Sequence, residues 1–237
     1  MSISETLSLR PARLGDLEDI VAITIAATAG QALISFNFPH RLEFPQDYYY
    51  HWKTLIKASF YDPNSIVLVV EKVSGDGRKV IAWVEWEWKG KDPAPHPPYC
   101  NSWTKAIGAR LFTIQTNIIK SFWTRHDDNP KNRSTWIVTK SRIDREYWSS
   151  QSRLIYLSAL YTQPEFQGQG SGTLLKNWGL ALAKQHHTVL GVIASHPPSV
   201  VIYKHWGFEE VEVVRMQQEG EPEYVDIHVL RHGPPDN

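Results

Sequence analysis

One six-residue segment combines three glycines in a pattern suited to binding an anion. Its residues are Gln167, Gly168, Gln169, Gly170, Ser171 and Gly172. An apolar stretch at 153–162 precedes it and an amphipathic stretch at 172–186 follows, so the segment should join a strand to a helix. Glycines leave backbone N–H groups unobstructed at the start of that helix, where the helix dipole also attracts negative charge. We therefore expect a phosphate-binding loop.

Two common nucleotide-binding loops match this segment less well. The P-loop has a lysine after its last glycine, whereas Thr173 and Leu174 follow here. The dinucleotide fingerprint has unequal glycine spacings and usually opens a domain, whereas these glycines alternate evenly and lie far along the chain. A nucleoside triphosphate and a nicotinamide cofactor are therefore both disfavoured.

The glycine-rich segment resembles the signature of the GCN5-related N-acetyltransferase (GNAT) superfamily. That signature has Gln or Arg, a glycine three positions later, and Gly or Ala two positions after that. The matching residues are Gln167, Gly170 and Gly172. Residues 203–208 match a tyrosine-containing pattern that the family often carries after its fifth strand, and 164–166 and 10–16 also look like the family. The resemblance covers roughly residues 7–89 and 153–232.

The resemblance implies an α/β fold with a mixed, mostly antiparallel central sheet flanked by helices, whose fourth and fifth strands are parallel and splayed. The cleft between these strands would receive the pantetheine arm of acetyl-CoA, the cosubstrate. Backbone amides would bind it, and an N–H near Leu160 or Tyr161 would polarise the thioester carbonyl. The implied binding residues are Leu160, Tyr161, Thr162, Gln167, Gly168, Gln169, Gly170, Ser171, Gly172 and Thr173.

Tyr203 is the candidate general acid that the resemblance implies. A phenol has a pKa near about 10, so it is protonated at neutral pH and suited to protonating a departing thiolate. The alternative is that Tyr203 only packs beside Phe208.

Glu85 and Glu87 are the candidates for the general base. Alternation along a predicted strand at 79–88 places both on one face, where neighbouring carboxylates raise each other's pKa. A solvated strand face also explains them. His196 is a further candidate, although a polar residue at a helix start explains it too.

Aromatic residues gather around this predicted strand and the segment that follows it: Trp83, Trp86, Trp88, Trp103 and Trp123. They predict either a pocket for an apolar or aromatic amine, or packing of an insertion onto the sheet. His228 and His232 lie on a predicted strand about 13 Å apart, too far to share one metal ion. We expect no metal site.

Hydrophobic periodicity and turn residues predict the remaining elements. A helix should follow Asp16, its expected N-cap, and another should cover 47–60, with a loop at 36–45 between them. A short helix should end near Gly207. The expected strands are 7–11, 65–72, 79–88, 153–162, 188–195, 208–216 and 223–230.

Residues 90–152 look like an insertion between the third and fourth strands of a single domain spanning 1–237. The insertion begins with prolines and continues with a helix at 103–122 whose apolar side should pack against the main fold. That apolar side consists of Trp103, Ile107, Leu111, Ile114, Ile118 and Phe122.

Composition limits the partners. Lys plus Arg and Asp plus Glu each total 25, so the whole chain has no net charge that would attract nucleic acid or an anionic membrane. No apolar run approaches the roughly 20 residues of a membrane helix. Cys100, the single cysteine, is expected to be a structural thiol and fits a reducing compartment, which predicts a cytoplasmic protein.

The sequence therefore predicts an acetyl-CoA-dependent N-acetyltransferase that acts on the primary amine of a small molecule, by direct attack in a ternary complex. Two alternatives remain: a protein lysine or N-terminal acetyltransferase, and a non-catalytic acyl-CoA-binding module. The protein should be a monomer or a homodimer.

Overall fold

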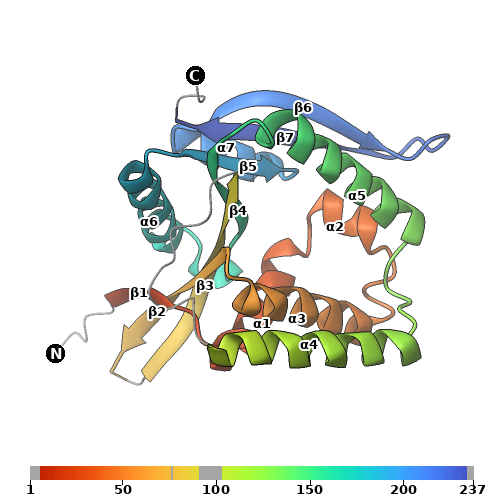
Figure 1. Cartoon of the computed structure of the whole chain (residues 1–237), viewed down its shortest axis with the longest axis horizontal. Coiled ribbons are helices and arrows are strands. Elements are labelled where there is room, and N and C mark those ends of the chain that lie inside the picture. Colours follow the sequence, from red (N-terminus) through yellow and green to blue (C-terminus); the bar gives the residue numbers. More distant parts are fainter. Residues whose placement is uncertain (1–5, 76, 91–102, 234–237) are drawn as a thin grey trace.

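The computed structural model describes residues 6–75, 77–90 and 103–233 (Figure 1). Within these ranges seven strands form one sheet in the order β1-β2-β3-β4-β5-β7-β6. Their bounds are β1 Thr6–Pro11, β2 Ser65–Ser74, β3 Gly77–Gly90, β4 Arg153–Thr162, β5 Val189–Ala194, β6 Glu209–Gln217 and β7 Tyr224–His232. All seven predicted strands are confirmed, with every end within two residues of its predicted position.

The pairing of the strands confirms the expected fold class. β4 and β5 are parallel, whereas every other neighbouring pair in the sheet is antiparallel. β2 with β3 and β6 with β7 form hairpins. Cys100 and the prolines of 92–98 lie outside the described residues.

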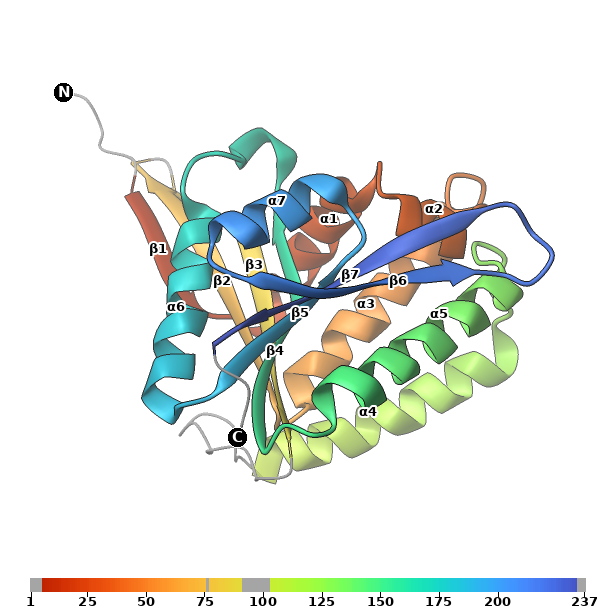
Figure 2. The same cartoon turned by 90° about the horizontal axis from the view of Figure 1, so that it is seen from above.

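Helices cover both faces of this sheet (Figures 1 and 2). α6 and α7 lie on one face, while α1 and α3 lie on the other, with α4 outside α3 and α5 alongside β6. The bounds are α1 Leu17–Thr28, α2 Ala32–Asn37, α3 Pro45–Tyr61, α4 Trp103–Phe122, α5 Pro130–Ile143, α6 Ser171–His186 and α7 Pro197–His205.

The tryptophans of β3 hold helices on opposite faces of the sheet. Trp83 faces α1, and its indole N–H donates to Thr24 Oγ1 at 3.0 Å. Trp86 and Trp88 are buried with residues of α6 on the other face. The suggestion that these last two rings hold the insertion is therefore wrong, because strand alternation directs them to the opposite side.

β4 and β5 separate partway along their length, as expected. Their ladder runs from Leu154 opposite Val189 only as far as Leu157 opposite Val192. At this point the register of β4 with β3 shifts, so that Ser158 is an extra residue between the paired positions. Such a bulge bends the strand and increases its twist, which accounts for the splay.

Two helices were not predicted from the sequence. α2 begins within the segment before the expected loop, and α5 lies in the part of the insertion for which no element is expected. α5 buries few side chains, among them Ile143, so its apolar pattern is weak. Asp16 does not cap α1 through its side chain, because its carboxylate binds Arg10 and the backbone N–H of Arg13 instead.

The helix predicted at 103–122 is confirmed as α4, but the predicted direction of its apolar side is wrong. α4 packs on α3 through Gly108 and Phe112, and the Phe112 ring lies 5.5 Å from that of Tyr61. The side chains of the predicted stripe are between 48% and 88% exposed. They are Ile107, Leu111, Ile114, Ile118 and Phe122; the side chain of Trp103 lies outside the described part.

Candidate functional site

A cleft of about 2030 Å³ opens where β4 and β5 separate. The end of β4, the glycine-rich segment and α7 line one part of it. The other part is lined by α3, by the inner side of α4 and by α5, so the helices between β3 and β4 form a wall of the cleft. Two reactants could therefore meet at the splayed strands from opposite ends.

The glycine-rich segment forms the turn between β4 and α6. Gly168 and Gly170 have positive φ angles of 76° and 92°, and no heavy atom lies within 4 Å of the position that a Cβ would take on either residue. Gly170 is the N-cap of α6. The first N–H groups of a helix have no intrahelical partner, so those of Ser171, Gly172 and Thr173 are suited to an anion at this open surface.

Side chains fasten this turn to the end of β4. Ser171 Oγ lies 3.2 Å from Thr162 Oγ1, and the amide group of Gln167 donates to the carbonyl oxygen of Thr162 at 3.3 Å. The backbone N–H of Gln167 donates to Pro164. It is therefore engaged within the turn, and the amides available to a ligand begin at Gly168.

The cleft brings together every sequence-predicted site residue except one. Gln169 does not line it, and its side-chain amide donates to the carbonyl oxygen of Glu165. The residues that line it are Glu85, Glu87, Leu160, Tyr161, Thr162, Gln167, Gly168, Gly170, Ser171, Gly172, Thr173, His196 and Tyr203.

The edge of β4 facing β5 has no ladder partner beyond Leu157 among the described residues. Leu160, Tyr161 and Thr162 continue along this edge while pairing with β3 on the other side. An edge of this kind can receive amide groups of a ligand as an added strand would supply them. It ends at the glycine-rich turn, so the two binding elements are continuous.

Tyr203 lies in α7 at the margin of the cleft and is 9% exposed. Its ring packs 5.7 Å from those of Trp206 and Phe208. Burial, and then the proximity of Tyr161, raises the pKa of the Tyr203 hydroxyl well above its ordinary value. The predicted packing beside Phe208 and a protonated hydroxyl at the cleft therefore coexist.

Glu85 and Glu87 point into the cleft from β3. Glu85 accepts a hydrogen bond of 2.8 Å from Ser65 Oγ, and Glu87 accepts one of 3.1 Å from Ser158 Oγ. Burial raises the pKa of Glu85; hydrogen bonds from Ser59 and Ser65 oppose this rise and the charge of Glu87 adds to it. Glu85 thus has the properties of a buried base rather than of a solvated strand face.

The cleft also contains a group that the sequence did not reveal. His51 Nδ1 lies 3.0 Å from Nη1 of Arg125, which forms a two-pronged ion pair with the buried Asp127. Burial, then the charges of Arg125 and Arg133, lower the pKa of His51 to about 3. His51 is therefore neutral at pH 7. The sequence does not reveal this group because its partner Arg125 lies more than 70 positions away in the chain.

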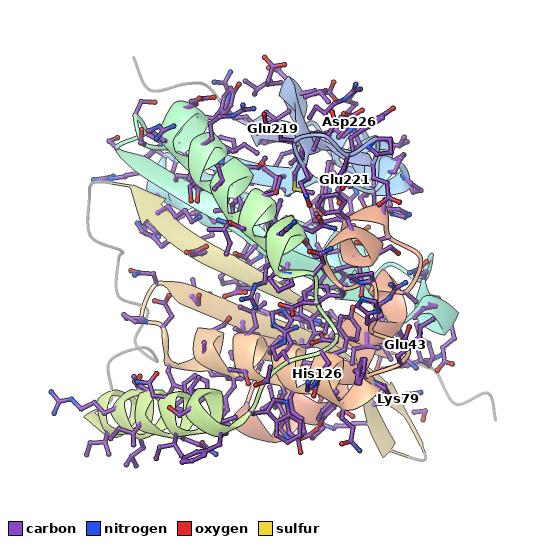
Figure 3. All side chains as sticks on the ribbon, turned by 90° about the vertical axis from the view of Figure 1, so that its right-hand side faces the viewer. Glu43, Lys79, His126, Glu219, Glu221 and Asp226 are labelled. Carbon is purple, nitrogen blue, oxygen red and sulfur yellow. The ribbon has the colours of Figure 1, made fainter. Side chains whose placement is uncertain are left out.

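The connection between α4 and α5 is fixed to the start of α3. Asp47 accepts hydrogen bonds from Trp123 Nε1 at 2.9 Å and from the backbone N–H of His126 at 2.8 Å. Figure 3 shows His126 where this connection passes α3. The contacts hold the helical wall of the cleft in position.

The three histidines singled out in the sequence have local partners. His196 is the N-cap residue of α7, and its Nδ1 lies 3.3 Å from Ser199 Oγ. His228 contacts Glu210, whereas His232 packs on Phe208. In the ranges described above, no three His, Cys, Asp or Glu side chains are grouped as metal ligands, and no helix is both long and apolar enough to cross a bilayer.

Comparisons with known proteins agree with this geometry. Residues 142–221 match the family model of the acetyltransferase (GNAT) domain, which covers the glycine-rich turn and α7. An acetyltransferase of Stachybotrys chartarum is 22% identical over 217 residues, which are 90% of this chain and 85% of that protein.

Two solved structures share the fold along almost the whole chain. One, described as histone acetyltransferase HPA2 and related acetyltransferase from Corynebacterium glutamicum, has a TM-score of 0.58 at 15% identity, with 98% of each chain covered. The other, polyamine N-acetyltransferase of Drosophila melanogaster, has a TM-score of 0.52 at 11% identity, with 97% of this chain and all of that chain covered.

Proposed function

Because this chain belongs to the GNAT superfamily of acetyltransferases, we propose that it transfers an acetyl group from acetyl-CoA to the primary amine of a small molecule. The observation that carries the proposal is the continuity between the free edge of β4 and the glycine-rich turn, inside one cleft. A ligand that combines amide groups with a pyrophosphate matches such a surface.

The pyrophosphate would bind the amides from Gly168 to Thr173, where open space and the start of α6 favour an anion. The pantetheine amides would pair with the edge of β4 from Leu160 to Thr162. An N–H near Leu160 or Tyr161 would donate to the thioester oxygen as negative charge develops on it.

The protein's own groups would then move two protons. Glu85 would accept a proton from the attacking amine, directly or through a water molecule, with Glu87 helping to keep its pKa raised. Tyr203 would donate its hydroxyl proton to the departing sulfur, since its raised pKa keeps that hydroxyl protonated. The amine nitrogen forms the bond to the acetyl carbon while the bond from that carbon to sulfur breaks.

Two features support a small, cationic acceptor. The part of the cleft that the donor would leave free is lined by two carboxylates, of Glu85 and Glu87, and by two aromatic rings, of Trp83 and Tyr161. Carboxylates and aromatic rings both attract an ammonium group. α4 and α5 form one wall of that part. The Drosophila relative in fold acts on a polyamine, whereas an open peptide groove would suit a protein substrate better.

The test is thiol release from acetyl-CoA, followed with three panels: polyamines, arylalkylamines, and peptides with free lysines or N-termini. We expect turnover with one of the small amines. Turnover restricted to peptides would favour a protein acetyltransferase, while acetyl-CoA binding without turnover on any amine would favour a non-catalytic module. Failure to bind acetyl-CoA would contradict the donor assignment.

We also propose a cytoplasmic location, which rests on Cys100 being the single cysteine.

A further inference from the structure

The outer side of α4 carries a row of large apolar side chains without cover from the described parts of the protein. Ile107, Leu111, Ile114, Ile118 and Phe122 recur at helical spacing and are each about half exposed or more. A contiguous apolar surface of this kind marks a site for binding another surface. α4 is therefore amphipathic with its apolar side directed away from the fold.

This surface is separate from the acceptor cleft. The cleft is lined by a neighbouring side of α4, about a quarter-turn round the helix from the row, through Phe112, Gln115, Thr116 and Ile119. α4 lies at the periphery of the molecule along α3, as Figures 1 and 2 show. Its 20 residues form a straight rod about 30 Å long that can lie flat against a surface.

Charge is distributed unevenly between this region and the rest of the chain. Residues 103–146 contain nine Lys and Arg, three Asp and one Glu, a net charge of +5, although the whole chain is neutral. α4 itself contains Lys105, Arg110 and Lys120 and no acidic residue. The zero net charge of the whole chain predicts no attraction to membranes, but it is an average that hides this basic region.

The C-terminal end of the row adds aromatic side chains. Phe122 is 88% exposed, and the half-exposed Trp123 follows it in the chain. The Trp123 ring lies 5.8 Å from that of Tyr50, where the two rings also form the margin of the cleft. Tryptophan and tyrosine favour the boundary between water and lipid, where the ring is apolar and its polar atom stays hydrated. Basic residues, an apolar side and terminal aromatic rings together are typical of helices that lie in a membrane interface.

We propose that α4 docks this protein onto an anionic membrane surface, with the apolar row inserted among the lipid headgroups and the exposed Arg110 beside the row facing acidic lipids. The charge of α4 argues against its pairing with a second copy, because like charges would meet. Docking in this orientation leaves the acceptor cleft on the neighbouring side of α4, close to the bilayer.

Vesicle co-sedimentation of the full chain tests the proposal. We expect binding to vesicles of phosphatidylcholine with phosphatidylserine, weaker binding to phosphatidylcholine alone, and weaker binding at high salt. The double change Ile114→Ser with Ile118→Ser should lower the partition coefficient about tenfold or more. Arg110→Glu should lower it by about tenfold, because it removes a cation and adds an anion.

Matched controls carry the same chemical changes elsewhere. Leu42→Ser alters an exposed apolar side chain outside α4, and Lys184→Glu reverses an exposed charge at the end of α6. Both should bind vesicles as the unmodified protein does. Circular dichroism would check that all variants fold, which we expect because the altered side chains are exposed.

Three outcomes would overturn the proposal. One is failure of the unmodified protein to bind acidic vesicles. Another is equal loss of binding in the control variants. The third is sedimentation velocity showing that the unmodified protein is a dimer and the Ile114→Ser, Ile118→Ser variant a monomer, without vesicle binding; the apolar row would then be an interface between copies.

Discussion

Gly170 and Gly172 are two residues apart in the glycine-rich turn, but only Gly170 has a backbone conformation that requires glycine. Its φ angle is 92°, whereas Gly172 lies in the first turn of α6. A Cβ on Gly172 would meet the Trp206 ring at 3.6 Å, an ordinary contact. The two glycines therefore have different physical roles, in agreement with a signature that requires glycine at the first position and also accepts alanine at the second.

Gly170→Ala should weaken acetyl-CoA binding by about tenfold. A left-handed conformation costs an alanine about 1–2 kcal/mol, so the turn would shift and its amides would lose their common direction. Isothermal titration with acetyl-CoA measures the effect, and Gly172→Ala is the matched control, expected within about twofold of the unmodified protein. Equal losses in the two variants would show that the side chain, not the backbone conformation, matters.

Tyr203→Phe should lower kcat by about a hundredfold and leave the affinity for acetyl-CoA almost unchanged. Phenylalanine fills the same space between Trp206 and Phe208, so the packing of α7 is kept. Steady-state rates and a binding titration of the same preparation separate the two effects. Unaltered turnover would rule out Tyr203 as the acid.

The carboxylates of β3 should shape the acidic side of the pH-rate profile. A base works only when deprotonated, and the pKa of Glu85 is raised, so kcat/KM should fall at a higher pH than an ordinary glutamate would give. Glu87→Gln removes a charge that raises this pKa, so the fall should move to lower pH.

Glu85→Gln should lower kcat/KM by about a hundredfold. It should also abolish the fall of kcat/KM at acidic pH, which is the part of the pH-rate profile that Glu87→Gln shifts. Any acidic fall that persists in Glu85→Gln belongs to ionisation of the amine substrate. Two results together would exclude this pair as the base: an unshifted pH-rate profile in Glu87→Gln and full activity in Glu85→Gln.

Local patterns were the part of the fold that could be predicted. The glycine-rich turn depends on the backbone conformation of a few consecutive residues, and the strands depend on alternation and turn residues, so both were evident. The separation of β4 and β5 was expected only from the family resemblance. The bulge at Ser158 that accompanies it left no signal in the sequence.

Features that depend on distant contacts could not be predicted. The contact between His51 and Arg125 joins residues far apart in the chain. An amphipathic pattern in α4 predicts a helix, but it does not state which surface covers the apolar side, and the assumption that the fold itself does was wrong. α5 could not be predicted because few of its residues are buried, so its sequence has no clear amphipathic pattern.

Asp47 should stabilise the protein in a pH-dependent manner. Burial alone would raise its pKa, but hydrogen bonds from His126 and Trp123 outweigh burial, so the pKa is lowered on folding. A lowered pKa stabilises the fold above the unfolded value of about 3.9, and this contribution is lost as the pH falls through the folded pKa.

Asp47→Asn should therefore reduce the free energy of unfolding by about 1–3 kcal/mol at pH 7, and by less at pH 3. Urea titrations at the two pH values measure the difference. Asp19→Asn, at an exposed position of α1, is the control and should change the free energy by less than about 0.5 kcal/mol. An equal cost for Asp47→Asn at both pH values would contradict the assignment.

Gly179 should be the most sensitive small residue of α6. A Cβ at this position would overlap the six-membered ring of Trp86, so α6 can approach β3 only because the residue is glycine. Gly179→Ala should lower the free energy of unfolding by about 1–3 kcal/mol through overpacking, measured by urea titration. Gly30→Ala is the control, because the space around Gly30 is open and its φ angle is not positive. Adding Trp86→Phe to Gly179→Ala should recover part of the loss, since the smaller ring makes room for the methyl group; purely additive costs would mean that the two residues do not constrain each other.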